Sequence, residues 1–132
     1  MATVKRRIPQ LSPWMTFELE TDLLDPPIFK VRLRPLDGWD QWQAASTPGQ
    51  EFGKAYHLLA MAIMAVVEWD LKDQEGKPIE VTEENKRGVL REILGEPVKV
   101  PEPEPGQEKE KAVMLGWAIV RAAQEKETFL KN

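Results

Sequence analysis

The sequence has no cysteine and very few histidines and serines, which are the residues that many enzymes use as nucleophiles or metal ligands. It has no cysteine, so it has no disulfide framework, no thiolate nucleophile and no thiolate metal site. His57 is the one histidine, so no histidine pair is present to bind zinc. Ser12 and Ser46 are the two serines, and neither lies in a Gly-x-Ser-x-Gly setting. We therefore expect a protein that is not an enzyme, with no catalytic residues, no metal site and no cofactor.

Long apolar runs and an excess of positive charge are also missing. The longest apolar run covers residues 58–67, whereas a membrane-spanning helix needs about 20 residues, so no contact with a membrane is expected. The net charge of −4 disfavours binding to nucleic acid. The basic residues 5–7 lead into a proline-containing segment and not into an apolar run. We therefore expect no signal peptide and interpret them as a solvated tail.

What is present is the composition of one folded domain. Hydrophobic residues make up 42% of the chain and charged residues 30%, which is typical of a globular protein and not of a disordered one. At 132 residues the chain is long enough to bury a core. Four segments are predicted: an extended N-terminal arm at 1–15, an α+β core domain at 16–97, a Pro/Glu linker at 98–106 and a C-terminal helix at 107–132.

Two segments alternate apolar and charged residues with period two, which predicts β-strands. They cover residues 16–20 and 28–34, and residues 25–27 (Asp-Pro-Pro) supply a turn between them. We therefore expect an antiparallel hairpin. Its charged side chains are predicted to pair across the two strands: Glu18 and Glu20 with Lys30, Arg32 and Arg34.

A short helix is predicted over residues 39–45, because Gly38 precedes it and the Thr-Pro-Gly at 47–49 ends it. Trp39 and Trp42 are three residues apart and so lie on neighbouring parts of this helix. Packing in the core is the interpretation that we favour for both, and an exposed docking pair is the alternative.

A central helix is predicted over residues 50–68, and the apolar run at 58–67 lies inside it. A helix that is apolar all round must be covered on every side. Leaving three or four of its large side chains in water would forfeit roughly 5–10 kcal/mol. We expect burial within the chain, and contact with a partner or a second copy is the alternative.

The acidic segment after this helix is predicted to be a turn and not a calcium loop. If Gly76 took the glycine position of an EF-hand, Leu71 and Thr82 would fall on the first and last ligand positions, and leucine cannot bind calcium. Residues 74–78 are strong turn formers, and Gly76 can adopt a positive φ. Thr82 is then the predicted N-cap of a further helix.

Residues 101–105 read Pro-Glu-Pro-Glu-Pro, which is typical of a stiff, extended linker. The helix predicted after it, over 107–130, is tethered, and folding back on the core or reaching a neighbouring copy are both open. The expected fold class is α+β: an N-terminal β-hairpin followed by a mainly helical domain with a linker-tethered C-terminal helix.

Four sequence segments resemble the tail assembly chaperones of long-tailed bacteriophages. An apolar helix leads into WDLKD at 69–73, then EGKPI at 75–79, then TEEN at 82–85 and a helix. Upstream, VRLRPL at 31–36 ends a hairpin strand and precedes an aromatic-bearing helix. Together the matching parts cover roughly residues 16–95.

The resemblance implies a function that is not enzymatic. Such chaperones bind the long, aggregation-prone tape measure protein and keep it soluble while tail tube subunits polymerise around it. By this resemblance we expect the tape measure protein as partner, the tail tube protein as a further candidate partner, and self-association. The expected location is the host bacterial cytoplasm, and the protein should be absent from the mature virion.

A chaperone for an apolar client needs adaptable hydrophobic surface, which the flexible thioether of methionine supplies. The methionines of the apolar helical segments and their large neighbours are therefore the predicted protein-binding residues: Leu58, Met61, Met64, Met114 and Trp117.

Two other functions remain open. One is a structural tail-completion or connector component, which would stay in the phage particle. The other is a small regulatory protein that binds a host target.

Overall fold

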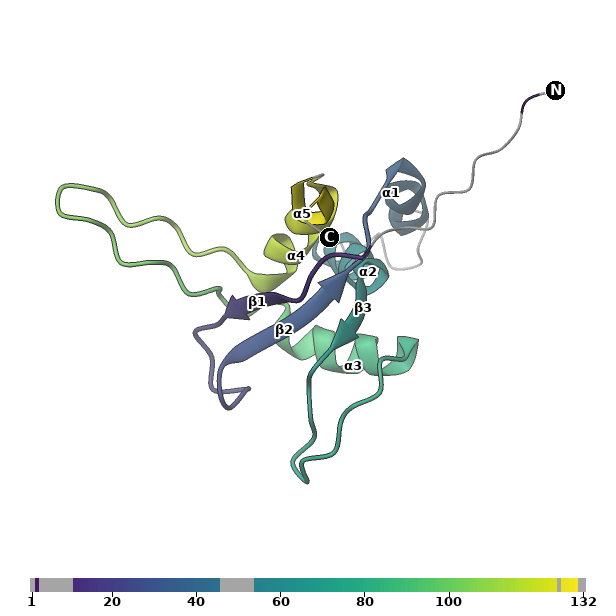
Figure 1. Ribbon diagram of the computed structural model, residues 1–132, viewed down its shortest axis with the longest axis horizontal. Helices are drawn as coiled ribbons and strands as arrows, with labels where there is room; N and C mark the ends of the chain where they lie inside the picture. The colour runs from purple at the N-terminus through teal and green to yellow at the C-terminus, as the bar shows by residue number, and fades with distance from the viewer. Residues whose placement is uncertain (1, 3–10, 46–53, 126, 131–132) are drawn as a thin grey trace.

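The computed structural model describes residues 2, 11–45, 54–125 and 127–130 of the chain. These residues form a three-stranded antiparallel sheet, in the order β1-β2-β3, together with helices (Figure 1). The predicted α+β class is confirmed. In chain order the elements are β1 (Met15–Glu18), β2 (Ile28–Leu33), α1 (Gly38–Ala45), α2 (Lys54–Ala65), β3 (Val66–Trp69), α3 (Glu83–Ile93), α4 (Leu115–Gln124) and α5 (Glu127–Leu130).

The predicted N-terminal hairpin is present as β1 and β2, which pair antiparallel. Alternate residues of β2 are fully buried, namely Phe29, Val31 and Leu33, because a strand with one covered face points every second side chain into the core. The alternation of apolar and charged residues in β2 therefore reflects the burial of one face of this strand.

The charge pairing predicted across the hairpin is wrong. Glu18 lies opposite Ile28 in the register of the two strands. Because the pairing of β1 begins at Met15, Arg32 extends beyond it and lies opposite Glu68 of β3 instead. The Arg32 Nη1 atom is 3.4 Å from Glu68 Oε2. Arg32 thus pairs with β3 and not with an acidic residue of β1.

The central helix is shorter than predicted, because α2 ends at Ala65 and Val66 begins β3. Backbone pairing with β2 causes the change. The N–H of Arg34 donates to the carbonyl of Ala65 at 2.9 Å, and Leu33 pairs with Val66. Two β-branched valines follow Ala65, and such residues favour a strand where an edge offers partners. The apolar run is therefore divided between a helix and a strand.

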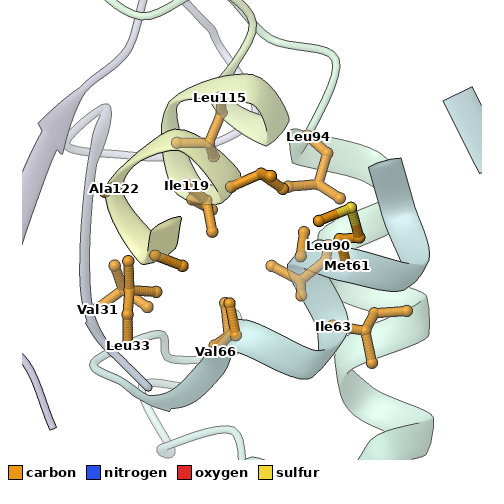
Figure 2. Packing of buried hydrophobic residues seen from close by; sticks show 14 of the residues in the cluster. Val31, Leu33, Met61, Ile63, Val66, Leu90, Leu94, Leu115, Ile119 and Ala122 are labelled. Carbon is orange, nitrogen blue, oxygen red and sulfur yellow. The ribbon is translucent and has the colours of Figure 1, made fainter. Parts of the chain in front are cut away.

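The helix α2 is covered within the chain, as expected for its apolar composition, by contacts with α1, α3, α4 and β3. Figure 2 shows how side chains of α2, α3 and α4 converge on one core together with those of β2 and β3. The labelled members of that core include Met61, Ile63, Val66, Leu90, Leu94, Leu115 and Ile119.

The last part of the chain differs most from the prediction. Helix α4 begins at Leu115 and not near residue 107, because the Glu- and Lys-rich residues before it offer no apolar face to bury. It packs directly on the domain. The N–H of Gly116 donates to Leu94 O at 3.0 Å, and a Cβ placed on Gly116 would lie 3.0 Å from Leu58 Cδ2.

Residues 99–113 form a long excursion that leaves the domain and returns to it (Figure 1). Both ends are held at its base, where the N–H of Val98 donates to Val113 O at 2.8 Å and Pro97 bridges to Met114. The stretch predicted as a linker is thus part of a projecting loop, and the helix that follows it packs on α2 of the same chain.

Candidate functional site

The acidic turn between β3 and α3 is a connector whose polar groups serve the turn itself. One Asp73 oxygen accepts hydrogen bonds from the N–H groups of Glu75 and Lys77, at 2.9 and 3.0 Å. Gly76 has a φ of 82°, as the sequence predicts. Thr82 caps α3 by accepting from Asn85 N at 3.0 Å, which confirms the predicted N-cap. In the described residues no group of three or more His, Cys, Asp or Glu side chains could hold a metal ion.

An open groove of about 640 Å³ lies between the β1–β2 connection and this turn. Its apolar wall includes Leu24 and Leu71, and Lys30 faces it together with Asp25 and Asp70. Charges of both signs therefore line the groove, so it favours neither an anionic nor a cationic ligand.

The structure separates the five predicted protein-binding residues into two groups. Leu58 and Met61 are buried in the core, and Met64 is half-buried. Met114 and Trp117 are exposed, at 44% and 49% of their surface. Met114 and Trp117 are therefore the most accessible of the five side chains to a partner.

Met114 and Trp117 form what we call the α4 strip. Met114 is the N-cap residue of α4, and Trp117 lies in the first turn of that helix. The opposite face buries Leu115, Ile119 and Val120 against the core. The α4 strip is thus an apolar surface on a helix whose position is set by packing from behind.

Trp39 and Trp42 form the second exposed apolar surface, the α1 tryptophan pair. They are 64% and 57% exposed, and their ring centroids lie 5.0 Å apart with an angle of 33° between the ring planes. The favoured prediction of core packing is therefore wrong, and the exposed arrangement is the one observed. Helix α1 instead turns Asp40 and Ala44, which are one helical turn apart, toward the protein.

The inward position of Asp40 is explained by its hydrogen bonds. Its two carboxylate oxygens accept from the Arg34 guanidinium, at 2.9 and 3.1 Å. Asp37 and Asp40 also form a capping box, in which each carboxylate accepts the N–H of the other residue at 3.0 Å. These bonds attach the N-terminus of α1 to the end of β2. They hold the α1 tryptophan pair in one orientation.

The electrostatics agree with this geometry. The hydrogen bond from Arg34 is the main reason that the pKa of Asp40 lies below its ordinary value of 3.8, and burial acts in the opposite direction. Asp40 is therefore ionised at neutral pH and neutralises Arg34. Asp37, by contrast, is exposed.

Comparison with known proteins gives no relative from which to assign a site. No protein-family model, curated protein or solved structure matches the chain. Within the described residues no helix combines the length and the hydropathy needed to cross a membrane. The candidate site therefore rests on the geometry of the α4 strip and the α1 tryptophan pair.

Sequence reasoning named Met114 and Trp117 among five candidate binding residues, without separating them from the buried ones, and it assigned the tryptophan pair to the core. One signal was available. The Asp-x-x-Asp spacing at 37–40 is that of a capping box, and it follows Arg34 closely enough for an ion pair. Turning Asp40 inward rotates the two tryptophans outward, because all three share one short helix.

Proposed function

We propose that this protein is a tail assembly chaperone of a long-tailed bacteriophage. It binds the tape measure protein and keeps it soluble while the tail tube assembles. The proposal includes self-association, contact with the tail tube protein, action in the host bacterial cytoplasm without a membrane or nucleic acid, and release before the virion is complete. The resemblance of residues 16–95 to that family supports it.

The observation that carries the proposal is the pairing of a filled core with exposed large apolar side chains on two helices. Many leucines, isoleucines and valines fill the core, although Leu23 is half exposed, whereas Trp39, Trp42 and Trp117 stay about half exposed or more. Clustered apolar side chains on an otherwise polar surface are typical of protein interaction sites. A chaperone that holds an aggregation-prone helical client needs such a surface.

The test is co-expression with the tape measure protein encoded in the same genome, with the soluble client as the readout. We expect the client to stay in solution with this protein and to precipitate without it. Soluble client in both cultures, or in neither, would refute the chaperone function. Mass spectrometry of purified virions then separates a chaperone, which should be absent, from a tail-completion or connector component, which should be present.

The contribution of the α4 strip is tested in the same culture with Met114→Asp and Trp117→Ala. Both should lower the amount of soluble client. Trp14→Ala is the matched control, because Trp14 is 51% exposed but lies outside α4, and it should behave as the unmodified protein. Equal effects of Trp117→Ala and Trp14→Ala would show that the α4 strip does not bind the client.

A further inference from the structure

The α1 tryptophan pair has a geometry suited to an anchor. The two rings lie against each other at 5.0 Å and leave their outer faces in water. The capping box and the bond from Arg34 fix the helix that carries them, so a partner would not have to order it. Rigid aromatic side chains on a preorganised support are the usual centres of binding energy in protein interfaces.

The area of the pair limits what can occupy it. A tryptophan side chain offers up to about 250 Å², so 64% and 57% exposure correspond to roughly 300 Å² for the two together. A stable dimer needs about 800 Å² from each partner. The pair alone is therefore too small for a permanent contact between two copies. It is the right size to anchor a short segment that binds and leaves.

The charges near the α1 tryptophan pair limit which segments could bind there. Residues 35–45 contain no lysine or arginine, and Arg34 before them is neutralised by Asp40. Asp37 adds an exposed carboxylate at the start of α1. A lysine or arginine brought to this surface would meet both the negative faces of the indole rings and the Asp37 carboxylate. A nucleic acid would instead meet the exposed Asp37 carboxylate, which disfavours it.

We propose that the α1 tryptophan pair binds an amphipathic helix whose apolar stripe is bordered by lysine or arginine. The inference rests on the proposed function, and it places this helix in the tape measure protein. The apolar stripe covers the outer faces of Trp39 and Trp42, and a basic residue beside the stripe pairs with Asp37.

The experiment uses the full chain and overlapping peptides of about 25 residues from the tape measure protein, long enough for about seven helical turns. Binding of each labelled peptide is measured by fluorescence anisotropy. We expect the bound peptides to share an apolar stripe at helical spacing with lysine or arginine at its border. Trp39→Ala combined with Trp42→Ala should weaken binding about tenfold or more, as the loss of an aromatic anchor does. Asp37→Asn should weaken it about two- to fivefold and reduce its dependence on salt.

The controls separate binding from folding. Both tryptophans are largely in water and alanine is the better helix former, so the double variant should keep the circular dichroism and melting temperature of the unmodified protein. Trp39→Arg is a second variant that keeps bulk at the site and should repel a basic peptide. Trp14→Ala should leave peptide binding unchanged, and Trp117→Ala reports on the α4 strip separately.

Three results would overturn the inference while the proposed function stands. One is a bound peptide whose affinity is equal for the unmodified protein and the Trp39 and Trp42 double variant. Another is a set of bound peptides whose apolar stripes are bordered by aspartate or glutamate. The third is full-length client kept soluble although no peptide binds. If the full-length client is not kept soluble either, the proposed function fails, and this inference fails with it.

Discussion

Replacing Asp40 by alanine tests the account of how α1 is held. Asp40 is almost fully buried and accepts two hydrogen bonds from Arg34 and one from the Asp37 N–H. Loss of a capping interaction costs about 1 kcal/mol, and hydrogen bonds to charged groups contribute about 1.5–3 kcal/mol each. Because about a third of the Arg34 side chain is in water, we discount the second figure. The expected loss is about 2–4 kcal/mol in the free energy of unfolding.

The assay is urea unfolding followed by circular dichroism, arranged as a double-mutant cycle with Arg34→Met. Residues that share a buried hydrogen-bonded pair should show a coupling energy of about 1 kcal/mol or more. The matched control is the pair of Glu75 and Lys77, which are 3.9 Å apart and exposed, and its coupling should stay below about 0.5 kcal/mol. A loss below about 0.5 kcal/mol for Asp40→Ala, or additive effects of the Asp40 and Arg34 variants, would refute the reasoning.

The same interaction has a pH signature. The pKa of Asp40 is lower in the folded state than its ordinary value of 3.8, so its contribution to stability is present above that pH. The contribution is lost as the pH falls from about 3.8 through the folded pKa. Asp40→Asn should lack this part of the acid destabilisation, and a variant with the same acid profile as the unmodified protein would contradict the assignment.

Two further predictions concern Lys86 and the excursion. Lys86 donates to Ile63 O at 3.0 Å, and burial lowers its pKa below 10.5, so the free energy of unfolding should rise with pH through the folded pKa up to about 10.5. Lys86→Met should remove this rise in denaturant unfolding at a series of pH values, and an equal slope in both proteins would count against it. Replacing residues 100–111 by a four-residue Gly/Ser turn should keep the fold and raise stability by up to about 1 kcal/mol, because a shorter loop costs less entropy to close. A large loss of stability in thermal unfolding would show that the excursion supports the core.

Local features of the fold could be predicted from sequence, because their causes lie within a few residues. The period-two pattern at 28–34 marks a strand with one buried face, and the Thr82 cap and the Gly76 turn depend on their own neighbours. Where α2 ends could not be predicted this way. Ala65 favours a helix and Val66 favours a strand, but such propensities are weak signals inside one apolar run, and the backbone pairing with β2 fixes the boundary.

In the candidate site, too, some features could be predicted from the sequence and others could not. Met114 and Trp117 were named as binding residues because methionines in apolar helical segments offer adaptable surface, but the same reasoning named Leu58 and Met61, which are buried. The tryptophan pair was assigned to the core because large aromatics are usually buried. The ion pair between Arg34 and Asp40 reverses that assignment, since one short helix cannot turn both Asp40 and the tryptophans inward.

The packing of α4 on α2 has a consequence for synthesis on the ribosome. Leu58 leaves the ribosome about 60 residues before Gly116, the glycine that closes over it. At translation rates of about 5–20 residues per second, the face of α2 that packs on α4 stays uncovered for about 3–12 seconds. During that interval the nascent chain exposes an apolar helix face. The finished protein is proposed to shield the same kind of surface in another polypeptide. A message cut short before α4 would therefore yield a product that aggregates, whatever the stability of the complete domain.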